Sequence, residues 1–398
     1  MQVLKSLHDL LSDECTTIHA TRLKALMINV AALIRGQTLT VTGLGRAPKR
    51  HRNTKHDIKQ SDRLIGNVHL QRERALLYGA IARHLLARTR EPIILIDWSD
   101  YTVDRSYLLL RASVPVGGRA LTLYEQVHPL KKYGNAAVQR AFLDTLQTFI
   151  DDKVQPIVVT DAGFIGPWFT EVRARGWHYV GRIRKNLLYR DDSTAQWTRC
   201  AALYAKATST PRYYGLIELA RRHPLRCHLH LLRQKPKGRH RITTRGQPAT
   251  GRASQKNALR ETSPWLIVTS LEPATHTAKH VIQLYKTRMQ IELAFRDIKN
   301  YRAGFALRQT RSRTPQRLAN LLLVGMLANF CLWLLGRAAI ERKAHYRLQA
   351  NTHRRTRVLS SFFIACQLVK QGRLPTRPTW LDNALALVHR DIDCQAAL

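Results

Sequence analysis

Two short apolar runs that each end in an aspartate constrain the fold of this chain most strongly. Pro92–Asp97 and Pro156–Asp161 consist largely of β-branched and other apolar residues, which is typical of buried strands. If the two strands are neighbours in one sheet, the carboxylates of Asp97 and Asp161 come together at their carboxyl ends. Either aspartate taken singly could instead be a turn or helix-cap residue.

The segments around these runs predict a mixed sheet flanked by helices. Strands are expected at Tyr107–Val116 and Arg119–His128, joined through two consecutive glycines, and at Trp177–Ile183. Helices are expected at Asn135–Ile150 and Pro167–Arg175. An antiparallel meander followed by helical crossovers to parallel strands predicts an α/β fold in which the first and fourth strands are neighbours.

A third acidic residue, Glu292, lies on a predicted helix near the middle of the second half of the chain. At about 100° per residue, Glu292 and three other side chains project within one sector about 60° wide. The other three are Tyr285, Arg288 and Lys299. The adjoining stripe is apolar and consists of Leu284, Ile291, Phe295 and Ile298. The competing interpretation is a solvated helix on which Glu292 makes ordinary ion pairs with arginines four residues away.

The charge of the chain favours a polyanionic partner. Its 65 Lys and Arg residues outnumber 27 Asp and Glu residues, which gives a formal net charge of +38 and a pI near 10.9. The cations are spread along the chain, so we expect the folded body itself to bind double-stranded DNA. If it neutralises on the order of ten phosphates, its affinity should fall with a log–log salt slope of about −9. An anionic membrane is the competing partner, but no basic amphipathic anchor stands out.

The cysteines and the longest apolar stretch indicate in which cellular compartment the protein is expected. The six cysteines are scattered without a C-x-x-C pair or zinc-finger spacing, so we expect reduced thiols in a cytoplasmic protein without structural zinc. The N-terminus lacks a signal-peptide pattern. Leu318–Gly336 reaches the lower limit of a membrane span, but two asparagines, a central glycine and basic flanks favour a helix buried in a large core.

The composition divides the chain into five expected segments. They are a helical DNA-binding domain (1–90), the first part of an α/β catalytic domain (91–186), a β-rich insertion (187–270), the second part of the catalytic domain (271–345) and a C-terminal helical segment that is a candidate dimer contact (346–398). The N-terminal helices and the cation-rich stretch Arg46–Arg52 suit a helix-turn-helix, with a plain helical bundle as the alternative. Lys235–Arg241 is expected to be a disordered basic loop, and Leu307–Arg317 a cationic loop suited to a phosphate backbone.

The residue types of the three acids suit metal-dependent phosphoryl transfer. Magnesium prefers hard oxygen ligands, and two such ions can activate a nucleophile and stabilise the departing oxygen. Asp97, Asp161 and Glu292 would supply these ligands from two strand ends and a helix. Other acids near them in sequence are expected to have no such role, and these are Asp100 and Asp104 in a loop, Glu125 on the third strand and Asp297 on the helix.

These motifs resemble the DDE transposases of bacterial insertion sequences, in the insertion-sequence-four family. The resemblance rests on Ile96–Asp100, on Val159–Phe164 and on the family's Y-(2)-R-(3)-E-(6)-K signature, which here is Tyr285, Arg288, Glu292 and Lys299. The resemblance spans nearly the whole chain and implies a ribonuclease H-like mixed sheet interrupted by a β-rich insertion. It also implies cut-and-paste transposition, in which each transposon end is nicked, closed as a hairpin, reopened and joined to target DNA.

The same resemblance implies roles for particular residues and partners. Asp97, Asp161 and Glu292 would be catalytic residues and ligands of two Mg²⁺ ions, for which Mn²⁺ can substitute. Tyr285, Arg288 and Lys299 would grip DNA near the cleaved end. Trp265 is the candidate platform for a flipped base, with a core strand position as its alternative, whereas Trp98 is expected in the core.

The partners expected from the resemblance are the terminal inverted repeats, the target DNA and a second copy of the chain, in a bacterial cytoplasm in association with the nucleoid. Two other functions stay open at this point. One is a catalytically inactive DNA-binding relic. The other is a ribonuclease H-like nuclease or resolvase that follows branched DNA.

Overall fold

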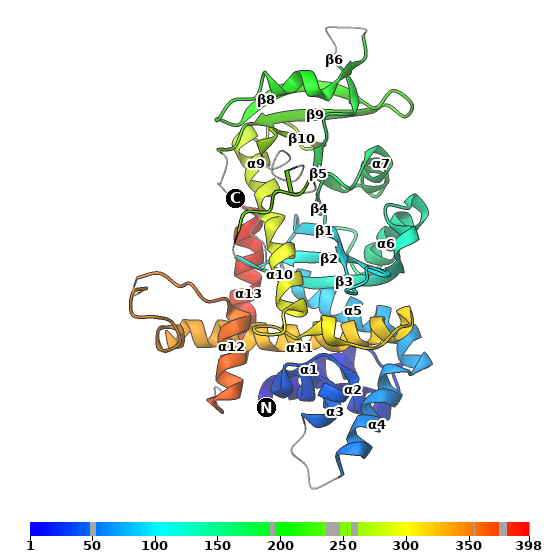
Figure 1. The fold of residues 1–398 in the computed structure, drawn as a ribbon, viewed down its shortest axis with the longest axis vertical. Coiled ribbons are helices and arrows are strands. Elements are labelled where there is room, and N and C mark those ends of the chain that lie inside the picture. The colour runs from blue at the N-terminus through cyan, green and yellow to red at the C-terminus, as the bar shows by residue number, and fades with distance from the viewer. Residues whose placement is uncertain are drawn as a thin grey trace. The chain divides into compact units, whose positions relative to one another are not determined.

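The computed structural model describes residues 1–47, 53–191, 196–235, 247–252, 254–255, 262–353, 355–373 and 380–397 (Figure 1). Their contacts divide the chain into two compact units. Unit 1 comprises Met1–Pro156 and Met289–Ala397, and unit 2 comprises Ile157–Arg288. The cation-rich stretch beyond Ala47 and most of the basic loop at 235–241 lie outside the described residues.

The N-terminal part of unit 1 is helical, as expected. Its helices are α1 (Gln2–Glu14), α2 (Ala20–Gly36), α3 (Val41–Arg46), α4 (Thr54–Ile65) and α5 (Val68–Leu86). The last three begin at Thr40, Asn53 and Asn67, whose side-chain oxygens accept backbone N–H bonds of the first turn. Helix α3 packs tightly on α4 because Gly45 lies against Ile58, where a Cβ atom would come within 2.4 Å of the Ile58 Cα.

Three antiparallel strands form the sheet of unit 1 in the order β3-β2-β1. They are β1 (Ile93–Asp100), β2 (Tyr107–Pro115) and β3 (Ala120–Pro129). The meander was therefore predicted correctly, but β1 runs three residues past Asp97. Asp100, which was expected in a loop, is the last residue of the strand.

The remaining helices of unit 1 include one long central helix, α11 (Pro315–Glu341). The others are α6 (Ala136–Gln147), α10 (Met289–Lys299), α12 (Ser361–Lys370) and α13 (Trp380–Ala396), with short 3₁₀ helices η1 (Leu130–Lys132), η3 (Leu307–Gln309) and η4 (Ala344–Arg347). In the described part of the chain, α11 is the one helix long and apolar enough to cross a membrane. It is buried nearly all round, against α2, α5, β3, α12 and α13, which confirms the expected core helix.

Unit 2 contains seven strands in the order β4-β5-β10-β9-β8-β6-β7. Their bounds are β4 (Ile157–Thr160), β5 (His178–Ile183), β6 (Leu188–Asp191), β7 (Thr198–Arg199), β8 (Arg212–Leu219), β9 (Leu225–Leu232) and β10 (Trp265–Thr269). Strands β4 and β5 are parallel, joined through α7 (Gly166–Ala174), and the other pairs are antiparallel. The β-rich insertion therefore extends the sheet that β4 and β5 begin. Unit 2 also contains η2 (Cys200–Tyr204) and α9 (Ala278–Thr287).

The single helix expected around Glu292 is divided in two, and the prediction was wrong in this respect. Helix α9 ends at Thr287 and α10 begins at Met289, so the break coincides with the boundary between the units. The Arg288 N–H donates to the Tyr285 carbonyl at 3.2 Å, a tighter turn than that of an α-helix. Both helices bury their apolar stripes, so the periodicity continues across the break and does not reveal it.

Candidate active site

Asp97 lies on β1 in a nearly enclosed position of unit 1. Its side chain is buried, with 8% of the residue exposed, and its Oδ1 accepts a hydrogen bond from the Trp98 backbone N–H at 2.8 Å. Across the strand pair it stands directly opposite Arg111. A carboxylate held on a strand between fixed neighbours has little freedom, which suits a ligand that must be in place before its cation arrives.

Glu292 lies on α10, which packs on all three strands of the unit 1 sheet. The helix buries the expected stripe of Ile291, Phe295 and Ile298, together with Ala294. Glu292 itself is exposed, on the side of α10 turned away from this core. The helix therefore presents a carboxylate from a backbone that packing holds rigid.

Lys299, at the end of α10, is tied to the strand that carries Asp97. Its Nζ donates to the Ser99 Oγ at 2.6 Å and lies 5.1 Å from the centre of the Phe295 ring. Ser99 follows Asp97 by two residues, so the two side chains share one face of β1. Lys299 and Asp97 therefore belong to one local group of residues.

The electrostatic environment of Lys299 is unfavourable to its own charge. Burial, followed by the positive charges of Arg308 and Arg111, lowers the pKa of the Lys299 ammonium to about 8. The carboxylates of Asp100 and Asp97 act in the opposite direction. An added anion beside this ammonium would stabilise its charged form.

The four acids that were set aside have partners within unit 1. The pairs are Asp100–Arg105 at 3.1 Å, Asp104–Ser106 at 2.9 Å, Glu125–Arg111 at 2.5 Å and Asp297–Arg119 at 2.5 Å. Glu125 and Arg111 are almost completely buried. The Glu125 and Asp297 pairs are buried or nearly so and have a structural role, whereas Asp100 and Asp104 have partners at the surface.

Asp161 directly follows β4 in unit 2 and is half-buried. Its Oδ1 accepts the Gly163 backbone N–H at 2.7 Å, and its carbonyl accepts the Phe164 N–H at 3.3 Å. Asp161 therefore stabilises the turn after the strand, which is the turn role given above as the alternative to metal binding. Its second oxygen is not used in these bonds.

Trp265, on β10, and Tyr285, on α9, meet in unit 2. Their rings are edge to face with centroids 4.9 Å apart. Tyr285 was expected on an open helix face, but it is 4% exposed because α9 packs on β10 and its neighbours. Trp265 is half-buried, between a core position and an open platform.

Two arginines flank this aromatic pair. The guanidinium of Arg182 lies 5.9 Å from the Trp265 ring centre, and that of Arg288 lies 6.0 Å from the Tyr285 ring centre. Burial raises the pKa of the Tyr285 hydroxyl, Arg288 and Arg182 oppose the rise, and Asp161 adds to it. The aromatic pair thus lies within electrostatic reach of the Asp161 carboxylate.

Arg182 was not among the predicted site residues, because no sequence motif around it distinguishes it from the other arginines. It belongs to the site through strand pairing, which sets it opposite Ile267 on the face of β10 that carries Trp265. Trp98, expected in the core, is half-buried, and its ring lies 5.7 Å from those of both His128 and Tyr133.

The three predicted metal ligands are divided between the units. Asp97 and Glu292 belong to unit 1 and Asp161 to unit 2. Among the residues that the structure describes, no group of three or more His, Cys, Asp or Glu side chains is arranged to hold a metal ion. Carboxylate oxygens on rigid elements fit a hard divalent cation by their chemistry, and their convergence stays a prediction.

A basic chain with an α/β fold and carboxylates on strands and a helix, accompanied by arginine, lysine and aromatic side chains, is typical of phosphoryl-transfer enzymes that act on nucleic acid. The family model for the transposase DDE domain matches residues 88–330. This match covers more than half of the chain, so the chain belongs to the transposase DDE domain family. No curated protein matches the chain.

Membership of this family implies DNA transposition and phosphoryl-transfer nuclease activity. It likewise implies DNA binding and, as for DDE transposases generally, use of a divalent metal ion. The matched span contains all three candidate acids and the whole Tyr–Arg–Glu–Lys signature.

Proposed function

We propose that this chain is the transposase of a bacterial insertion sequence of the insertion-sequence-four family, similar to the transposase of transposon ten. It would nick each transposon end, form and resolve a hairpin there, and transfer the freed strand into target DNA. The observation that carries the proposal is the transposase DDE domain over 88–330, which includes every residue of the catalytic signature. A ribonuclease H-like architecture is consistent with the flanking helices and with strands that pair both antiparallel and parallel.

In this proposal Asp97, Asp161 and Glu292 together hold two Mg²⁺ ions, or Mn²⁺ in their place. The ions would supply an activated nucleophile and charge stabilisation at the scissile phosphate. The chain supplies the rigidity, because β1 and α10 hold two carboxylates within one packed unit and the turn at Gly163 orients the third.

The aromatic and cationic residues would hold the transposon end. Lys299 and Arg288 suit phosphate oxygens, and Trp265 offers a ring face to a base that leaves the stack during hairpin formation. Tyr285 supports that ring from its edge, and Arg182 supports it from the neighbouring strand. The half-buried state of Trp265 means that a base would have to displace its present neighbours.

Three surfaces of unit 1 suit the DNA backbone outside the catalytic residues. Helix α4 exposes Lys55, His56, Lys59 and Arg63, as a helix that enters the major groove would. The expected cationic loop exposes Arg308, Arg311 and Arg313. A third surface is the loop before α12.

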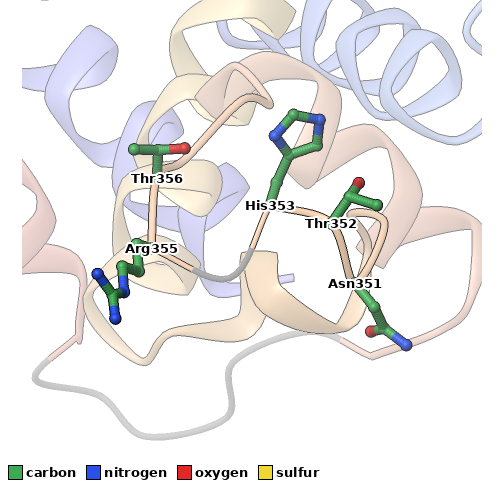
Figure 2. Close-up of a pocket in the computed structure, with 5 residues that line it drawn as sticks. All are labelled: Asn351, Thr352, His353, Arg355 and Thr356. Carbon is green, nitrogen blue, oxygen red and sulfur yellow. The ribbon is translucent and has the colours of Figure 1, made fainter.

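That third surface contains a polar pocket lined by Asn351, Thr352, His353, Arg355 and Thr356 (Figure 2). The side-chain amide of Gln349 donates to the carbonyls of His353 and Thr356, which holds the loop in shape. From Arg342 to Leu381 the sequence contains no acidic residue. A surface of this charge suits a phosphate backbone, in a homodimer assembled on paired ends in the bacterial cytoplasm and associated with the nucleoid.

The decisive experiment compares nicking of end-bearing DNA by the wild type and by Asp97→Ala, Asp161→Ala and Glu292→Ala. The matched control is Asp104→Asn, which removes a carboxylate from the loop after β1. We expect each alanine variant to lose nicking while still binding ends in EDTA, and the control to retain it. A wild type that nicks no faster than Asp97→Ala would indicate a DNA-binding relic. Cleavage of branched DNA without regard to terminal repeats would indicate a nuclease or resolvase.

A further inference from the structure

Three charged residues stand in register across the unit 1 sheet. Asp97 on β1 faces Arg111 on β2, and Arg111 in turn faces Glu125 on β3. Directly opposed residues of an antiparallel pair project from the same face with Cβ atoms about 5 Å apart. The row therefore alternates in charge, with the candidate metal ligand at one end.

The middle residue of this row is held from several sides. The Arg111 Nε donates to the Glu125 Oε2 at 2.7 Å, and its Nη2 lies 2.5 Å from the same oxygen. Its guanidinium also lies 4.8 Å from the Phe295 ring centre of α10. The Tyr78 hydroxyl donates to the Glu125 Oε1 at 2.9 Å, so both oxygens of that carboxylate are engaged.

Stability alone is a weak reason for such an arrangement. Both Arg111 and Glu125 are 1% exposed, and a buried ion pair is often no more stabilising than apolar residues of similar volume. What the pair provides is a cation at a fixed place on the residue that lies directly opposite Asp97 in the neighbouring strand. A guanidinium held by Glu125 and Phe295 cannot follow the Asp97 carboxylate, so it restricts where that carboxylate can lie.

We propose that Arg111 is a positioning residue for Asp97, and that Glu125, with Tyr78, holds Arg111 in place. The proposal deepens the proposed function, since it rests on Asp97 being a metal ligand. Arg111 acts through Asp97 and touches neither DNA nor the reacting phosphate. Residues that orient a ligand of a metal site commonly change metal affinity or activity by about 10- to 100-fold when they are replaced.

The charges of the pair have a separable consequence for metal binding. The positive charge of Arg111 beside Asp97 opposes a divalent cation, and the negative charge of Glu125 offsets it. Glu125→Gln keeps the shape and an oxygen acceptor for Tyr78, but it removes this offset together with the oxygen that accepts from Arg111. We expect it to weaken Mn²⁺ binding about threefold or more, measured by electron paramagnetic resonance of free Mn²⁺ without any turnover. Unchanged Mn²⁺ binding in folded Glu125→Gln protein would contradict the electrostatic part of the proposal.

A double variant separates positioning from folding. Arg111→Met with Glu125→Met removes both buried charges at once, so we expect thermal unfolding close to that of the wild type. End binding in EDTA should also be unchanged, while single-turnover nicking at saturating Mg²⁺ should fall about tenfold or more. A double variant that folds and nicks at the wild-type rate would show that the pair is only structural.

Two further variants complete the design. Arg111→Lys keeps the charge but loses the fork that binds Glu125, and we expect nicking between those of the wild type and the double variant. A rate below that of the double variant in a folded protein would overturn the assignment. Asp97→Ala in the same assays distinguishes the two proposals. If Asp97→Ala nicks normally, the proposed function fails, whereas an inactive Asp97→Ala beside a fully active double variant overturns the positioning role alone.

Discussion

The Nζ of Lys299, on α10, donates a hydrogen bond to the Oγ of Ser99, on β1, at 2.6 Å. This contact ties the helix that carries Glu292 to the strand that carries Asp97. It lies entirely within unit 1, so two of the three candidate ligands are related through one packed element pair. Ser99 is therefore the neighbour through which the signature lysine is held near the candidate catalytic aspartate.

Removal of this hydroxyl should weaken catalysis more than folding. Ser99→Ala takes away the acceptor that orients the Lys299 ammonium, and a hydrogen bond to a charged group contributes about 1.5–3 kcal/mol. We expect nicking to fall about tenfold, with Ser99→Thr close to the wild type because it keeps the hydroxyl. Single-turnover nicking of end-bearing DNA measures both, and equal rates for Ser99→Ala and the wild type would contradict the prediction.

End binding should take up protons in mildly alkaline solution. The pKa of Lys299 is lowered to about 8 by burial, so this side chain is partly neutral above that pH and regains its proton beside a phosphate. We expect proton uptake on binding at pH 8.5 and almost none at pH 6.5, measured by calorimetry in buffers of different ionisation enthalpy. Lys299→Arg should abolish the difference, since arginine stays charged throughout.

The same group affects stability with a definite sign. Between pH 8 and its ordinary value of 10.5, the unfolded chain binds more protons at Lys299 than the folded chain does. The folded state therefore gains stability from this group as the pH rises through that window. Comparison of urea unfolding of the wild type and Lys299→Met at pH 7.5 and pH 9.5 should show the wild type gaining relative to the variant.

Acid should destabilise unit 2 through His230. This residue is fully buried on β9, its two ring nitrogens have no hydrogen-bond partner among the described residues, and burial, with His228, lowers its pKa to about 4. The unfolded chain binds more protons between pH 6.5 and pH 4, so stability falls as the pH falls, by at most about 3 kcal/mol. His230→Leu should reduce this loss in denaturant unfolding at pH 7 and pH 5. His223→Gln, at an exposed position, should leave it unchanged.

Arg182 should matter after the first nick more than before it. Its guanidinium lies beside the Trp265 ring, so Arg182→Gln should loosen the proposed base platform. We expect hairpin formation to fall about tenfold while first-strand nicking stays within about threefold, because unstacking a base depends on the platform that receives it. Arg184→Gln, an exposed arginine two residues further on, is the matched control. Equal effects of the two variants would mean that Arg182 has no special role.

A single methyl group at Gly336 should separate two helices of unit 1. A Cβ atom there would lie 2.0 Å from the Ser361 carbonyl oxygen at the start of α12, a backbone atom that cannot easily move. At Gly325 the nearest atom is a flexible Leu39 methyl at 2.8 Å. We expect Gly336→Ala to cost about 1–3 kcal/mol in unfolding free energy and Gly325→Ala clearly less. Chemical denaturation of the two variants provides the comparison.

The elements that were predicted well are those whose evidence lies in one short window. The apolar runs before Asp97 and Asp161, the glycine turn between β2 and β3, and the buried α11 are all visible in local periodicity and composition. The choice of candidate acids was also local, because strand ends and the spacing around Glu292 single them out. The division of the helix at Arg288 was not visible, since the apolar stripe continues across it.

Sequence by itself thus determined the α/β class, the basic character and the residue types able to bind metal and phosphate. Only the tertiary structure decided which side chains meet, such as Lys299 with Ser99, Arg182 with Trp265 and Arg111 with Glu125, and that Arg111 lies opposite Asp97 in the sheet. The physical reason is that periodicity depends on neighbours a few residues apart. Strand register and helix packing instead depend on the free energy of burying segments that are far apart in the chain. A short stretch of sequence does not contain this information.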